Sequence, residues 1–168
     1  PPADVRFVAS DVGGGFGAKN FLYAEHVLIP WAAKRTGRTV KWIATRSETF
    51  LSDHQARDQS AEAELALDAE GRFLALRIDA LANLGAYMAG GAGGLQTYQF
   101  VHLLGTVYDI PAVALRGRAA LTNAAPIGVT RCPGFAESTN IMERLIDRAA
   151  RQCGFDRAEL RRRNFVRR

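Results

Sequence analysis

The sequence has few cysteines, and it has neither a long apolar run nor a basic-then-apolar segment at its start. Its two cysteines, Cys132 and Cys153, are too few for a disulfide framework and do not stand at a zinc-binding spacing. No apolar run approaches the ~18 residues that a membrane-spanning helix needs, and no basic segment followed by an apolar one opens the chain. These absences argue against a disulfide scaffold, a zinc domain and a membrane protein. They predict a reduced, cytoplasmic chain.

The sequence does have enough apolar residues for a packed core. Hydrophobic residues make up 48% of the 168 positions and charged residues 23%. The net charge of +5 is concentrated near the C-terminus, where nine arginines lie between Arg144 and Arg168. A basic end can bind nucleic acid, but these arginines lack the interleaved aromatic residues that stack bases. We therefore expect them on outer helix faces or against other parts of a longer protein, with no nucleic-acid partner.

Alternation of apolar residues predicts strands. Residues 5–10 and 39–45 are rich in β-forming side chains. Residues 61–68 and 73–82 alternate on either side of a tight turn, which indicates a long antiparallel hairpin. Residues 108–122 are expected to be extended as well.

Helical spacing predicts three helices. The first spans about residues 21–35, with His26 on its buried face. The second spans residues 140–152, and its apolar face continues into Cys153, which is expected in the core. The third is a short helix that opens at Asp156.

The order of these elements predicts an α+β fold in a single domain, residues 1–168. We expect a mixed sheet with one strand–loop–helix crossover over residues 5–35, the long antiparallel hairpin, and two C-terminal helices.

A glycine loop, Gly13-Gly14-Gly15-Phe16-Gly17-Ala18-Lys19-Asn20, separates the first expected strand from the first helix. Glycines let the main chain itself approach an anionic or polar ligand, and the helix N-terminus adds partial positive charge. A dinucleotide-binding loop fits the glycine spacing, but the acidic residue that should close the second strand is missing. A triphosphate-binding loop is excluded, because Asn20 follows Lys19 where a hydroxyl side chain is needed. A glycine-rich turn without a ligand is the third interpretation.

The segment from Asp11 to Lys19 resembles the signature loop of the molybdenum hydroxylases, the xanthine dehydrogenase and aldehyde oxidase family. Similar segments follow in order along essentially the whole chain: residues 41–48 with His54, Arg57 and Asp58; Thr122, Asn123, Thr130, Arg131, Gly134 and Glu137; and residues 143–147 and 160–165. The molybdenum-binding subunit of that family is several times longer than this chain, which starts with Pro1 rather than Met. We therefore expect a fragment of the molybdopterin-binding region of a larger subunit.

The resemblance implies a molybdenum–molybdopterin cofactor, in its cytosine dinucleotide form, and hydroxylation of an electron-poor carbon with oxygen derived from water. It also implies a 2Fe–2S cluster and FAD on other modules, since two unpaired cysteines cannot ligate an iron–sulfur cluster. The implied partners are the remainder of the large subunit, the iron–sulfur and flavin subunits or domains, and a small-molecule substrate.

By the same resemblance, Gly14, Gly15, Phe16, Gly17 and Arg131 lie beside the cofactor. Phe16 would shield the metal from water, and the Arg131 guanidinium would approach the cofactor or a metal-bound oxygen. The chain is expected to supply no metal ligand and no catalytic residue, because the general base of the family lies in a motif that this sequence does not contain.

A substrate pocket is expected at Asn20, Gln99, Cys132 and Pro133. Purine hydroxylases of the family have a glutamate and an arginine where Asn20 and Gln99 stand, so the resemblance favours an aldehyde or a neutral N-heterocycle as substrate. The Arg131-Cys132 pair is similar to an arginine–cysteine pair in the active-site loop of carbon monoxide dehydrogenase, where the cysteine carries copper. A Mo/Cu large subunit of that type is one alternative, and a non-enzymatic binding module with a Rossmann-like glycine loop is another.

Overall fold

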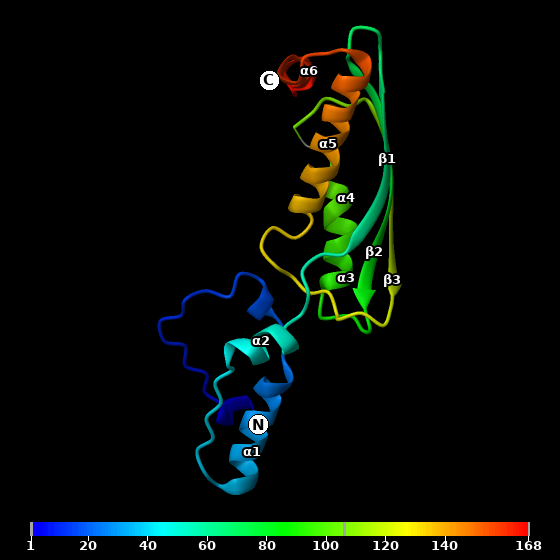
Figure 1. Cartoon of the computed structure of the whole chain (residues 1–168). Coiled ribbons are helices and arrows are strands. Elements are labelled where there is room, and N and C mark those ends of the chain that lie inside the picture. The colour runs from blue at the N-terminus through cyan, green and yellow to red at the C-terminus, as the bar shows by residue number, and fades with distance from the viewer. Residues whose placement is uncertain (1, 106, 168) are drawn as a thin grey trace.

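The computed structural model describes residues 2–105 and 107–167, which form two arms joined at a narrow waist (Figure 1). One arm holds the N-terminal segment, α1 (Ala24–Thr36) and α2 (Arg46–Ser52). The other arm holds a three-stranded sheet with helices on one face. No helix in the described part of the chain is long and apolar enough to cross a membrane.

The sheet has the order β1-β2-β3, with β1 (Gln59–Leu67), β2 (Phe73–Gly85) and β3 (Ala112–Leu121). β1 runs antiparallel to β2, and β2 runs parallel to β3. The central strand alternates buried and exposed residues along its length, as expected when helices cover one face of the sheet and solvent the other. The mixed sheet, the antiparallel hairpin and the α+β class are therefore confirmed.

The parallel pair β2–β3 requires a crossover connection, and this connection is helical. It comprises α3 (Ala92–Gly94), a π-helical turn η3 (Leu95–Gln99) and α4 (Phe100–Leu103). The sequence pattern predicts no helix here because glycines dominate its start. The helical crossover packs against the inner face of the sheet, where Phe100 is 1% exposed.

The hydrophobic core lies between the sheet and the helices α5 (Phe135–Cys153) and α6 (Arg157–Asn164). The largest fully buried side chains come from every layer: Leu76, Ile78, Phe100, Ile146 and Leu160. Both C-terminal helices are confirmed, and Asp156 caps α6 by accepting hydrogen bonds from the N–H groups of Ala158 and Glu159.

Residues 5–10 and 39–45 are not strands, so the expected crossover over residues 5–35 is wrong. A strand needs a neighbour for its main-chain hydrogen bonds, and neither segment lies beside the sheet. Their side chains are open to solvent instead, with Phe7 94% exposed. The parallel crossover of the fold is the one between β2 and β3.

Two expected core residues are exposed. His26 lies on an exposed face of α1, where its ring Nδ1 accepts a hydrogen bond from the N–H of Tyr23 and so caps the helix. Cys153 is the last residue of α5 and faces the groove between α5 and β1, which is open to solvent. Apolar periodicity identifies a helix face, but it does not show whether another element covers that face.

Asn164 joins α6 to the β1–β2 turn, and it supplies a test of this arm. Its buried side chain accepts a hydrogen bond from the N–H of Phe73 at 2.8 Å and donates to the C=O of Gly71 at 2.8 Å. Asn164→Ala should lower the free energy of unfolding by about 1–3 kcal/mol for each buried group left without a partner. Urea unfolding measures this, with exposed Asn140→Ala as the control. Equal losses in the two variants would contradict the assignment.

Candidate functional site

Part of the main chain of the glycine loop is exposed to solvent. Gly13 and Gly14 are exposed, and neither forms a hydrogen bond within the described part of the chain. Gly14 (φ +106°) and Gly17 (φ +89°) adopt conformations that favour glycine. Phe16 also has a positive φ, +51°, and its side chain is 68% exposed. The loop thus offers free N–H groups and one aromatic ring to a ligand.

A second segment, residues 129–134, lies against this loop. The N–H of Arg131 donates a hydrogen bond to the C=O of Phe16 at 2.9 Å. A Cβ atom added at Gly17 would lie 3.0 Å from both Cγ1 and the carbonyl oxygen of Val129. The structure therefore brings together the residues expected beside a cofactor: Gly14, Gly15, Phe16, Gly17 and Arg131. Their role in holding one stays a prediction.

Three of the four expected pocket residues lie in one region. Cys132 is exposed, with a φ of +57°, and Pro133 follows it. A Cβ added at Gly134 would lie 3.3 Å from Cγ of Gln99, so the helical crossover reaches this segment. Asn20 ends the short helix η2 (Ala18–Asn20) on the other side of the glycine loop. Among the described residues it forms no hydrogen bond or ion pair with the other three.

The end of the glycine loop is fastened by polar contacts. Nζ of Lys19 forms an ion pair with Asp53 at 2.7 Å, and the Tyr23 hydroxyl donates to the C=O of Ala18 at 2.6 Å. The His54 ring stacks on the Tyr23 ring with 4.9 Å between centroids. Burial raises the pKa of the Tyr23 hydroxyl and lowers the pKa of the His54 imidazole.

His54 packs between the end of the glycine loop and the segment that leads into residues 129–134. Its Cβ would lie 2.6 Å from a Cβ added at Gly128, just before Val129. Its ring also meets the rings of Phe21 and Tyr87 edge-on. His54 lies in a segment that resembles the family, but the resemblance implies no role for it. In the structure it is a packing residue.

The sequence patterns miss two residues of the site, Arg57 and Glu137. The Arg57 guanidinium donates hydrogen bonds to the carbonyl groups of Thr130, Arg131 and Cys132, and it forms an ion pair with Glu137. The only sequence signal for this arrangement is that both residues fall within the segments that resemble the family.

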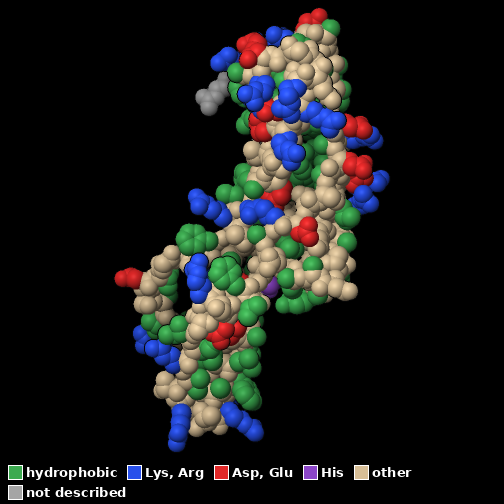
Figure 2. All heavy atoms as spheres, viewed as in Figure 1, with side chains coloured by type: hydrophobic (Ala, Val, Ile, Leu, Met, Phe, Trp, Pro, Cys, Tyr) green, Lys and Arg blue, Asp and Glu red, His purple; other side chains and the backbone are tan. Residues whose placement is uncertain are grey.

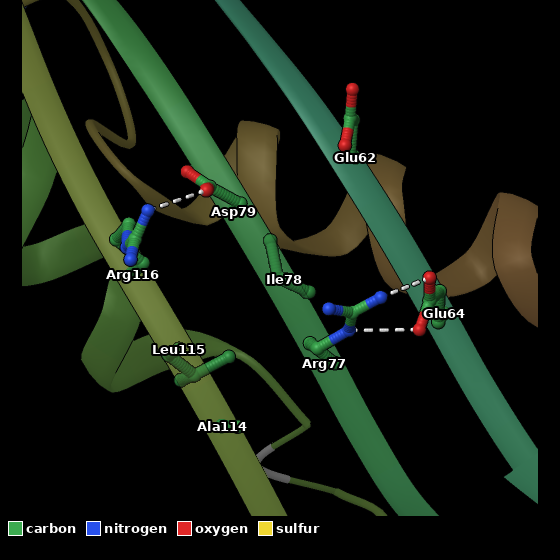
Figure 3. Close-up of a pocket in the computed structure, with 8 residues that line it drawn as sticks. All are labelled: Glu62, Glu64, Arg77, Ile78, Asp79, Ala114, Leu115 and Arg116. Atoms are coloured by element: carbon green, nitrogen blue, oxygen red, sulfur yellow. Dashed lines mark hydrogen bonds and ion pairs between the residues drawn. The ribbon is translucent and has the colours of Figure 1, made fainter.

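A different hollow lies on the open face of the sheet, and Figure 3 shows the charged side chains that line it. These side chains pair with one another across the strands, Arg77 with Glu64 and Arg116 with Asp79. Because four of its five charged side chains already form ion pairs, this hollow is a poorer candidate than the glycine loop. Within the described residues, no three His, Cys, Asp or Glu side chains cluster as metal ligands.

Residues 1–165 match the family model of the molybdopterin cofactor-binding domain. The chain belongs to this family. It is 36% identical over 166 residues to the 6-hydroxypseudooxynicotine dehydrogenase complex subunit gamma of Paenarthrobacter nicotinovorans, covering 99% of this chain and 21% of that protein. It is also 36% identical over 169 residues to the carbon monoxide dehydrogenase large chain of Hydrogenophaga pseudoflava, with coverage of 99% and 21%.

Solved structures of the family have the same fold. Quinoline 2-oxidoreductase from Pseudomonas putida 86 superposes with a TM-score of 0.82 at 40% identity, over 94% of this chain and 20% of that one. The aldehyde oxidoreductase from Desulfovibrio gigas gives a TM-score of 0.83 at 27% identity, with coverage of 92% and 17%. The chain thus spans about a fifth of the length of the relatives it matches. These homologues are oxidoreductases, and the matches do not favour the alternative of a Rossmann-like binding module.

The lowered pKa of His54 predicts a pH-dependent stability. The unfolded imidazole has its ordinary pKa of 6.5 and the folded one a lower pKa, so below pH 6.5 the unfolded state binds more protons. The free energy of unfolding should therefore fall as the pH drops from 6.5 through the folded pKa. His54→Phe keeps a ring against Tyr23 and should reduce this fall in urea unfolding, whereas His102→Phe, at an exposed position of α4, leaves the His54 imidazole in place and should keep it. Unchanged pH dependence in His54→Phe would refute the prediction.

Proposed function

We propose that the chain supplies one wall of the molybdopterin site in the large subunit of a molybdenum hydroxylase. The substrate is an aldehyde or a neutral N-heterocycle, oxidised with oxygen derived from water. The cofactor has the cytosine dinucleotide form, and a 2Fe–2S cluster and FAD on other modules carry the electrons away. The enzyme acts in the cytoplasm.

The observation that supports this proposal most directly is the solvent-exposed main chain of the glycine loop, which lies beside residues 129–134. Gly13 and Gly14 have free N–H groups, which suit the anionic and polar groups of a nucleotide cofactor. Gly14 and Gly17 lack a Cβ at positions where one would meet the Phe16 ring or Val129, so the loop can keep this open conformation against residues 129–134. The residues present therefore fit the cofactor that the family binds.

The bound cofactor supplies the redox chemistry, and this chain supplies position and charge. Gly14 to Gly17 bind it through the main chain, and the exposed ring of Phe16 excludes water from one side. The Arg131 guanidinium stays charged and donates hydrogen bonds in a fork, which stabilises a fixed anionic centre. The general base that takes a proton belongs to another part of the large subunit.

The charge of the expected pocket supports this substrate class. Gln99, Cys132 and Pro133 carry no formal charge, and Gln99 lies against Gly134 beside the Arg131 segment. A pocket without an ionic partner suits a neutral molecule better than a purine that needs charged contacts. The exposed thiol of Cys132 does not by itself indicate copper, since a free cysteine commonly acts as a small apolar residue.

Gly17 offers a test of the binding site. Gly17→Ala should reduce the molybdenum and cytidine nucleotide content of the purified full-length enzyme by about tenfold, because the new methyl group would push Val129 away at a φ of +89°. Gly94→Ala, in the helical crossover and outside the glycine loop, is the matched control, since nothing lies within 4 Å of its Cβ position. Elemental and nucleotide analysis reports both. Full molybdenum content in Gly17→Ala would argue against the glycine loop as part of the site.

The isolated chain should be catalytically silent. It lacks the proposed general base and the opposing wall of the site, so we expect no turnover of benzaldehyde or quinoline with a dye acceptor. The full-length enzyme, assayed in parallel, should oxidise one of the two. Turnover by the 168-residue chain alone would overturn the assignment of the base to another segment.

A further inference from the structure

One guanidinium group holds the turn that carries Arg131. Arg57 lies in the segment between α2 and β1, far from that turn in sequence. Its Nη2 donates to the C=O of Thr130 at 2.9 Å and to the C=O of Cys132 at 3.2 Å, and it also contacts the C=O of Arg131. Three successive carbonyl groups thus point at one nitrogen. Such a convergence fixes the backbone of the turn from outside it.

The turn needs this support because its conformation is strained. Cys132 has a φ of +57° without being glycine, a conformation that is costly unless surrounding contacts offset it. The N–H of Arg131 is meanwhile committed to the C=O of Phe16. The backbone on both sides of the Arg131 side chain is therefore held by groups that belong to other segments.

Glu137 keeps Arg57 in place. Its carboxylate, in the first turn of α5, is 8% exposed and lies 3.3 Å from Nε of Arg57. Within the described residues neither carboxylate oxygen has a hydrogen-bond partner, so Arg57 is the charge that compensates it. A buried carboxylate without its partner is strongly destabilising. Arg57 therefore combines two functions, charge compensation on the Nε side and backbone support on the Nη2 side.

We propose that Arg57, oriented by Glu137, is a positioning residue that sets where the Arg131 guanidinium meets the cofactor. The inference rests on the proposed function and adds a residue to that site. A lysine cannot replace Arg57, because its single ammonium cannot meet both the carboxylate and the three carbonyl groups in the fixed geometry of a guanidinium fork.

The experiment separates positioning from folding in the purified full-length enzyme. Arg57→Met/Glu137→Gln removes both charges, so no buried carboxylate is left unpaired. Arg57→Lys keeps the positive charge but removes the forked set of N–H donors of the guanidinium group. The matched control is Arg77→Met/Glu64→Gln, which removes an exposed ion pair between β1 and β2. Each protein is measured for Tm, for molybdenum per subunit, and for hydrogen exchange in the peptide that covers residues 129–134.

We expect Arg57→Met/Glu137→Gln to have a Tm close to that of the unmutated enzyme, about tenfold less molybdenum, and faster exchange in residues 129–134. Arg57→Lys should show the same molybdenum loss and faster exchange, while the control pair should leave all three readouts unchanged. The proposal would be overturned if Arg57→Lys, or the double variant, had the same molybdenum content and the same hydrogen-exchange rate in residues 129–134 as the unmutated enzyme. A lack of molybdenum in the unmutated enzyme would instead refute the proposed function.

Discussion

The hydrogen bond from the Arg131 N–H to the Phe16 C=O is the contact on which the site depends, because it joins two loops with no regular structure. Each loop has a non-glycine residue at positive φ, Phe16 in one and Cys132 in the other. Both conformations are costly in isolation, so neither loop would hold its shape alone. Gly17 lies close to Val129, and polar contacts fasten the end of the glycine loop. These interactions let each loop stabilise the other.

The two arms are stabilised by different physical means. The sheet arm has a continuous core under β2, whereas α1 and α2 contain no buried residue and the N-terminal arm exposes many large apolar side chains (Figure 2). Near the site, this arm is attached by the hydrogen bond from the Arg131 N–H to the Phe16 C=O and by the edge-on packing of the His54 ring against Tyr87. The glycine loop therefore lies where a well-packed arm meets a sparsely packed one. Its backbone stays open to a ligand there.

The sequence predicts those elements whose periodicity matches their burial. The β1–β2 hairpin and α6 are correct because alternation, turn chemistry and the Asp156 cap agree with one another. Residues 5–10 show the same alternation but have no strand beside them, so local pattern alone fails. The helix α2 is missed although Thr45 and Glu48 form a capping box that could have revealed it. The helical crossover is hidden by the glycines at its start.

The candidate site could be located by resemblance, but its geometry could not be derived from any pattern. Loops have no periodicity, and the contacts that shape them link residues far apart in the chain, such as Arg57 and Cys132. The ion pair between the partly exposed Arg57 and the buried Glu137 carboxylate is weak support for stability, because desolvation opposes the attraction of the charges. The guanidinium also donates to three consecutive carbonyl groups, which a hydrophobic pair could not do. Such a pair therefore contributes to the shape of the turn rather than to the stability of the fold.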